Sequence, residues 1–137
     1  MDTLHSEAGP LCKVDYVDIG PNKAWGYPID DTHQEKFTDY SKTILQHDRA
    51  FDLILVDGRF RVACTLNAIK HTLEKQDNIR DRAIFIRGFW IRPEYYPVLE
   101  FLDAEHTEES AAVFLLKSNI NTDLLQTALE KYKYVPA

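Results

Sequence analysis

The feature that most constrains this fold is a short apolar run that ends at Asp57-Gly58 and leads straight into a helical pattern. Residues 51–56 predict a buried strand, and residues 61–73 predict an amphipathic helix. The apolar positions of that helix recur at helical spacing: Val62, Leu66, Ile69 and Leu73. A strand followed at once by a helix is typical of open α/β sheets, whose ligands bind beyond the carboxyl ends of the strands. The turn therefore marks one edge of a candidate site.

The remaining elements follow from periodicity and from turn residues. Strands are expected at 12–19, 51–56, 83–86 and 111–116, and helices at 38–47, at 61–73, from Pro93 and after Asn121-Thr122. The last helix should turn Leu124, Leu125, Ala128, Leu129 and Tyr132 inward. Residues 20–31 are expected to form a loop, residues 74–82 a connection, and the acidic run at Glu105, Glu108 and Glu109 a solvated loop.

Alternating strands and helices predict an α/β fold, a three-layer α/β/α Rossmann-like sheet of about four to five mostly parallel strands. Right-handed crossovers would place helices on both faces, and the final strand would run antiparallel at an edge. Residues 1–11 are interpreted as an N-terminal arm and residues 12–137 as one domain, because 137 residues suffice for a single core.

Composition narrows the function classes. The net charge of −6 disfavours nucleic acid as a partner, because nonspecific binding needs a cationic surface. The start of the chain lacks a signal-peptide pattern and no apolar run is long enough to span a bilayer, so a cytoplasmic protein with no membrane partner is expected. The five histidines and two cysteines show no ligand spacing, so no metal site is expected, and Cys64 is interpreted as a buried structural thiol.

Four strings carry a family resemblance: Val-Asp-Ile-Gly-Pro (17–21), Trp-Gly-Tyr-Pro (25–28), the stretch 52–63, and Phe-Trp-Ile-Arg-Pro-Glu-Tyr-Tyr (89–96). Over residues 13–118 the chain resembles the C-terminal half of a class I S-adenosylmethionine-dependent methyltransferase-like family, largely uncharacterised and of bacterial type. The resemblance implies a truncated methyltransferase-like sheet whose first strand corresponds to the third strand of the family.

Two departures from that family bear on catalysis. The sequence has no glycine-rich loop of the kind that cradles the cofactor. Arg87-Gly88 stands where the family commonly carries His-Asp or a similar acidic pair, and arginine is a poor general base. We therefore expect a degenerate, non-catalytic domain with a structural or ligand-binding role, no catalytic residue and no cofactor, with S-adenosylmethionine as the alternative.

The candidate ligand-binding residues lie mostly after two predicted strands: Asp18, Asp57, Gly58, Arg59, Arg61, Arg87, Trp90 and Arg92. Four of them are arginines, whose guanidinium groups suit phosphate or carboxylate. Each residue also has a plain structural explanation. Asp57 could cap a helix, Gly58 could permit a turn, Asp18 could shape the turn at Gly20-Pro21, and the arginines could form surface ion pairs. Trp25 and Trp90 could stack on a ring or bury the flank of the sheet.

Three functions therefore stay open. The first is the degenerate domain. The second is a methyltransferase completed by oligomerisation or by a partner chain, because loss of the first two strands would leave strand 51–56 with an exposed edge. The strand at 12–19 could alternatively fill that edge. The third is a small module that binds phosphate or a nucleotide-sugar at an arginine rim.

Overall fold

The computed structural model describes residues 12, 14–75 and 82–137. The predicted arm at 1–11 and most of the connection at 74–82 lie outside these residues. Helical segments are η1 (Ala24–Gly26), η2 (Gln34–Lys36), α2 (Phe37–Ser41), η3 (Thr43–Gln46), α3 (Arg61–Lys75), η5 (Pro93–Glu100) and α4 (Thr122–Tyr132). Strands are β1 (Leu53–Val56), β2 (Ala83–Ile86), β3 (Leu102–Glu108) and β4 (Ala111–Leu116).

The four strands form one sheet in the order β1-β2-β4-β3. β1 and β2 are parallel, with Leu53 opposite Ala83, while β4 runs antiparallel to both of its neighbours. Three strands thus share one direction and β4 opposes them. This confirms a truncated α/β sheet with one antiparallel strand at 111–116. The predicted edge position of that strand is wrong, because β3 lies outside it.

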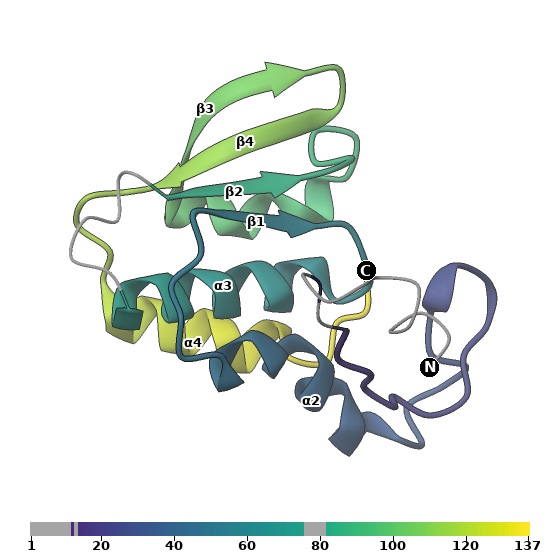
Figure 1. Cartoon of the computed structure of the whole chain (residues 1–137). Coiled ribbons are helices and arrows are strands. Elements are labelled where there is room, and N and C mark those ends of the chain that lie inside the picture. The colour runs from purple at the N-terminus through teal and green to yellow at the C-terminus, as the bar shows by residue number, and fades with distance from the viewer. Residues whose placement is uncertain (1–11, 13, 76–81) are drawn as a thin grey trace.

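One face of the sheet carries the core. Alternate residues of the strands point to this face and are buried: Val56, Ile84, Ile86, Ala112, Phe114 and Leu116. They pack against Leu66 and Ile69 of α3, and against buried residues of η5 and α4. Figure 1 shows α2, α3 and α4 on this same side of the sheet. The two-residue period of the strands and the 3.6-residue period of α3 therefore meet in a single apolar layer.

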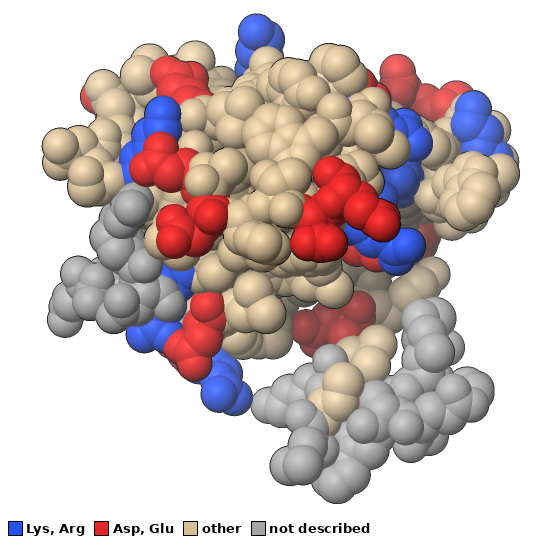
Figure 2. Space-filling view, turned by 90° about the horizontal axis from the view of Figure 1, so that it is seen from above, with Lys and Arg blue, Asp and Glu red and all other residues tan. Residues whose placement is uncertain are grey.

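The opposite face of the sheet has no helix over it within the described residues (Figure 1). Leu53 and Leu55 are 62% and 60% exposed there, and Phe85, Val113 and Leu115 are only partly buried. Figure 2 looks down on this face and shows a broad uncharged area with charged residues around its margin. The predicted third layer, with helices on both faces, is therefore wrong for this part of the chain. We call this surface the open face.

The predicted strand at 12–19 does not form. Its described residues run alongside α2 and η3 instead, held by the pair His47 Nε2 and Asp15 Oδ2 at 2.9 Å and by Lys36 Nζ and Asp18 Oδ2 at 3.2 Å. A helical neighbour already uses its own backbone groups, so no ladder can form along it. β1 consequently keeps an unpaired edge among the described residues.

The predicted acidic loop is also wrong, because Glu105 and Glu108 belong to β3. Only Leu102 of this strand is buried, so β3 is held by its ladder with β4 and gives no burial pattern. A register shift between Ala104 and His106 interrupts that ladder.

Three helix predictions need adjustment. The segment 38–47 is divided between α2 and η3, and the hydroxyl of Thr43 donates to Asp39 O at 2.7 Å, a local bond of the kind that competes with regular helix. The helix from Pro93 is a 3-10 helix, because Pro97 inside it has no N–H to donate. In α4, Asn121 caps the first turn as predicted, but Leu124 is 47% exposed and does not face the core.

Candidate functional site

The site is built on the turn between β1 and α3. Phe60 takes a left-handed backbone conformation, with φ of 56°, and its ring is fully buried 5.1 Å from that of Phe37. Backbone N–H groups of Phe60 and Arg61 donate to Pro136 O at 3.1 Å and to Ala137 O at 3.2 Å. A left-handed non-glycine residue is strained and persists only where surrounding contacts hold it. The turn is therefore tightly fixed.

Arg61 ties this turn to the end of β2. Its Nε donates to Gly58 O at 2.9 Å, its Nη1 donates to Arg87 O, and its Nη2 lies 3.4 Å from Asp57 Oδ1. The other carboxylate oxygen of Asp57 is 3.7 Å from Nη1 of Arg87. The polar groups of Arg61 and Asp57 thus bond mainly to one another and to the backbone.

A cavity of about 490 Å³ opens beyond the carboxyl ends of β1 and β2. Its volume falls in the range of roughly 300–1,000 Å³ that is usual for small-molecule sites. The lining residues are Trp25, Tyr27, Asp57, Gly58, Arg59, Arg61, Arg87 and Arg92. The fold therefore brings together six of the eight sequence-predicted residues, including all four arginines.

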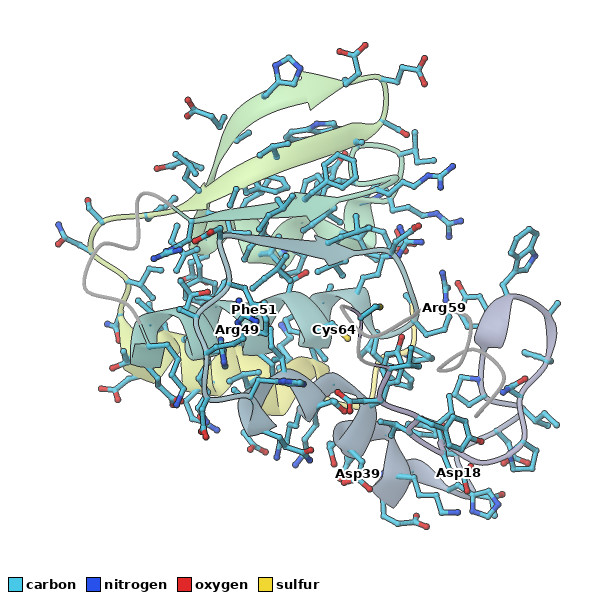
Figure 3. The ribbon with its side chains drawn as sticks, in the orientation of Figure 1. Asp18, Asp39, Arg49, Phe51, Arg59 and Cys64 are labelled. Atoms are coloured by element: carbon cyan, nitrogen blue, oxygen red, sulfur yellow. The ribbon has the colours of Figure 1, made fainter. Side chains whose placement is uncertain are left out.

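Arg59 differs from Arg61 in its bonding. Its guanidinium carbon lies 4.2 Å from the centre of the Tyr27 ring, a cation–π contact that fixes the side chain. Its Nη1 is buried and has no hydrogen-bond partner within the part of the chain that the structure describes. Figure 3 shows Arg59 pointing from the turn toward the loop that carries η1. A buried donor without an acceptor is costly, so this nitrogen contributes nothing to stability through hydrogen bonding.

The second wall of the cavity comes from residues 20–29, where Trp25 was considered for stacking on a ring but was not among the predicted ligand-binding residues. Lys23 N donates to Tyr27 O at 2.7 Å and Ile29 N to Pro21 O at 3.2 Å, which closes the loop on itself. Trp25 sits at its tip with φ of 65° and is 87% exposed. It does not bury a flank of the sheet. The glycines and prolines of 20–31 signalled a loop, but nothing in them signalled that it folds back onto Arg59.

Asp18 and Trp90 lie elsewhere. Asp18 accepts from Gly20 N at 2.8 Å and from Lys36 Nζ, and these bonds, the first above all, lower the pKa of its carboxyl. Figure 3 places it well away from Arg59. The Trp90 ring packs against Phe89 and Phe114, and its Nε1 donates to Thr107 at 3.2 Å. Both residues have the structural roles that were their alternatives.

Close packing supports the inner side of the turn. A Cβ on Gly58 would lie 2.6 Å from the Tyr40 hydroxyl oxygen, so only glycine fits there without a shift. Burial raises the pKa of the Tyr40 hydroxyl, and burial raises the pKa of the nearby Cys64 thiol to about 12. The Cys64 Sγ donates to Arg59 O at 3.7 Å. Cys64 is thus held neutral and structural.

The charge of the cavity bears on the methyl donor of the resembling family. Among the described residues of the lining, four arginines face one aspartate, a formal excess of three positive charges. Such a lining disfavours the sulfonium cation of S-adenosylmethionine, while guanidinium groups suit its carboxylate. The lining therefore favours the anionic groups of a ligand.

Two further classes of site were sought in the described residues. No three His, Cys, Asp or Glu side chains in residues 12, 14–75 and 82–137 gather closely enough to hold a metal ion. Among the helices of the same residues, none has the length and apolar character needed to cross a membrane.

With the fold and cavity defined, the chain was compared with known proteins. It matches no protein family and no curated protein. Among solved structures it resembles a methyltransferase-like protein from Silicibacter pomeroyi DSS-3, with a TM-score of 0.69 and 28% identity. The match covers 89% of this chain but 61% of the other, so this chain spans less than two thirds of that protein's length. The fold is therefore methyltransferase-like.

Proposed function

We propose that this chain is a non-catalytic, methyltransferase-like domain, equivalent to the C-terminal half of that fold, whose cavity binds a phosphate-bearing ligand. The observation that carries the proposal is the convergence of four arginines on one cavity. Guanidinium groups bind phosphate through paired, charge-assisted hydrogen bonds, which are stronger than neutral ones.

The arginines differ in how far the protein already bonds them, and this difference supports the same ligand class. Arg61 is occupied by the protein, whereas Arg87 is 72% exposed and, among the described residues, Arg92 has a single ion-pair contact, 3.9 Å from Glu94. Three guanidinium groups are therefore available to a bound anion. Local positive charge in a protein of net charge −6 is the kind of concentrated field that selects an anionic ligand.

The non-catalytic part of the proposal rests on the chemistry of the lining. Asp57 is its one carboxylate and is held between Arg61 and Arg87. A general base must be free to take a proton from substrate, and arginine does not fill that role.

Thermal unfolding with pyrophosphate tests the proposal. A ligand that binds only the native state stabilises it by about 2.7 kcal/mol at 100 times its Kd, which raises Tm by several degrees. We expect this rise in the natural chain and its loss in the triple variant Arg59→Met, Arg87→Gln, Arg92→Gln. The control is Arg49→Gln, an exposed arginine outside the cavity lining. Absence of any shift with pyrophosphate in the natural chain would refute the function.

A second candidate is a methyltransferase assembled from two copies of this chain. The observation that favours it is the edge of β1, which is unpaired among the described residues and carries no charge from Leu53 to Val56. The other edge, β3, is charged and irregular, features that discourage pairing. Antiparallel pairing of β1 with its copy about Ile54 would oppose Leu53 to Leu55 and Ile54 to its own copy, while Val56 would lie opposite Asp52, just outside the strand.

This candidate has its own test. It predicts a dimer by light scattering, conversion to monomer by Leu55→Lys, and binding of S-adenosylmethionine by the dimer in calorimetry. A monomer at millimolar concentration, or a dimer that does not bind the compound, removes it.

A further inference from the structure

The loop that closes the cavity carries an aromatic residue in an unusual position. Trp25 is 87% exposed and occupies a left-handed conformation that residues with large side chains rarely adopt. Both features are unfavourable, since the backbone is strained and a large apolar surface stays in water. The loop is nevertheless closed by its own backbone bonds, including Gly26 N to Lys23 O at 3.1 Å.

The rings of this loop are used differently. Tyr27 is covered by the guanidinium group of Arg59, so one of its faces is occupied. Trp25 lines the same cavity with its ring largely bare. The cavity therefore combines an open aromatic surface with a group of cations. A ligand that uses both has a planar ring and a negatively charged group.

We propose that the phosphate-bearing ligand is of the nucleoside monophosphate class. Its base stacks on Trp25, and its phosphate is bound by Arg59, Arg87 and Arg92. This inference rests on the proposed function and adds a planar ring to the phosphate-bearing ligand. Base stacking on an aromatic side chain tolerates any base, so the structure selects the class rather than one nucleotide.

The experiment compares three probes by calorimetry: AMP, ribose 5-phosphate and adenosine. Stacking contributes about 5- to 150-fold in affinity, so AMP should bind tighter than ribose 5-phosphate by a factor in that range. Adenosine, without the phosphate, should bind more weakly than AMP. Trp25→Ala should reduce AMP affinity to that of ribose 5-phosphate and leave the latter unchanged, while Trp25→Phe should retain most of the difference.

A fluorescence measurement supplies the matched control. The chain contains two tryptophans, and Trp90 is packed against Phe89 outside the cavity lining. Trp90→Phe therefore leaves Trp25 as the sole reporter. AMP should quench its emission, ribose 5-phosphate should quench it much less, and AMP affinity should match that of the natural chain.

The outcomes separate this inference from the function beneath it. Equal affinity for AMP and ribose 5-phosphate, unchanged by Trp25→Ala, would overturn the aromatic subsite while the anion site stands. Failure of every phosphate compound, including pyrophosphate, to bind would overturn the anion site and the inference together. Equal affinity for adenosine and AMP would overturn the assignment of the phosphate to the arginines.

Discussion

The two walls of the cavity each carry an arginine, but the polar groups of the two walls are bonded in different ways. The inner wall is Asp57, Gly58 and Arg61, whose polar groups are mainly paired within the turn and with the end of β2. The outer wall is Trp25, Tyr27 and Arg59, where one ring is bare and one guanidinium nitrogen lacks an acceptor. The inner wall therefore serves the fold, and the outer wall is left for a ligand.

This difference explains why two arginines only two residues apart should respond differently to substitution. Removing a partner from a satisfied buried network leaves other groups unpaired, which is costly. Removing a donor that is already unpaired costs little. The following predictions test this contrast in order of expected effect.

We expect the largest effect on the free energy of unfolding at alkaline pH, and it comes from Cys64, which lies beneath the inner wall. Burial raises the pKa of Cys64 from 9.0 to about 12, so the native state holds the thiol proton more tightly than the unfolded state does. Its contribution is complete below pH 9 and is lost as the pH rises to 12, about 3 kcal/mol between pH 9 and pH 12. Urea unfolding should show this extra loss in the natural chain relative to Cys64→Ala. Parallel pH profiles for the two proteins would contradict it.

Arg61→Met should lower the free energy of unfolding by about 2–3 kcal/mol. The substitution leaves Gly58 O and Arg87 O without their donor and leaves Asp57 without its closer partner. Urea unfolding measures the change, and Arg49→Met, on the exposed segment before β1, should stay within about 0.5 kcal/mol. If both variants are equally stable, the inner wall is not structural.

Gly58→Ala should cost roughly 1–3 kcal/mol, because the new Cβ meets the Tyr40 hydroxyl oxygen at 2.6 Å. The same substitution in a Tyr40→Phe background should cost much less, since the clashing atom is gone. A double-mutant cycle by chemical denaturation checks this. Additive costs would show that Tyr40 is not the obstacle.

Arg59→Met should leave stability within about 1 kcal/mol and weaken pyrophosphate binding at least tenfold, which is about 1.4 kcal/mol. The unpaired Nη1 and the ligand contact are removed together, while the methionine stem still packs on Tyr27. Unfolding and calorimetry on one preparation separate the two effects. A large loss of stability with unchanged affinity would reverse the roles of the walls.

The smallest effect belongs to Arg87→Gln. The side chain is 72% exposed and its contact with Asp57 is 3.7 Å, so the ion pair adds less than about 1 kcal/mol to stability. Affinity for pyrophosphate should fall a few-fold and become less sensitive to salt. A loss of pyrophosphate affinity larger than that of Arg59→Met would show that Arg87, and not Arg59, lies at the centre of the anion site.

Much of the fold could be predicted from sequence, because buried apolar residues recur with the period of a strand or of a helix. The expected and observed bounds agree for β2, β4 and the start of α3, because each buries alternate or helically spaced residues. β3 escaped prediction because its partner strand holds it and six of its seven residues are exposed. The sequence of 12–19 alternates like a strand, but its described residues lie beside helices, and pairing depends on a neighbour that local sequence does not specify.

The candidate site, like the fold, could be predicted only in part. Asp57, Gly58, Arg59 and Arg61 follow one strand, and Arg87 and Arg92 follow its parallel neighbour, so their convergence follows from topology. Trp25 and Tyr27 reach the cavity through the folding of a loop whose contacts are long-range. Asp18 lies at the end of the expected strand at 12–19, and Trp90 follows the expected strand at 83–86. Both side chains form hydrogen bonds within the protein, away from the cavity.

The most direct test of the central claim is a crystal structure of the chain grown with pyrophosphate. We predict density for the anion in the cavity, with its oxygens about 2.7–2.9 Å from guanidinium nitrogens of the lining arginines Arg59, Arg87 and Arg92. A cavity without the anion, in a crystal grown with pyrophosphate well above the concentration that raises Tm, would contradict the account.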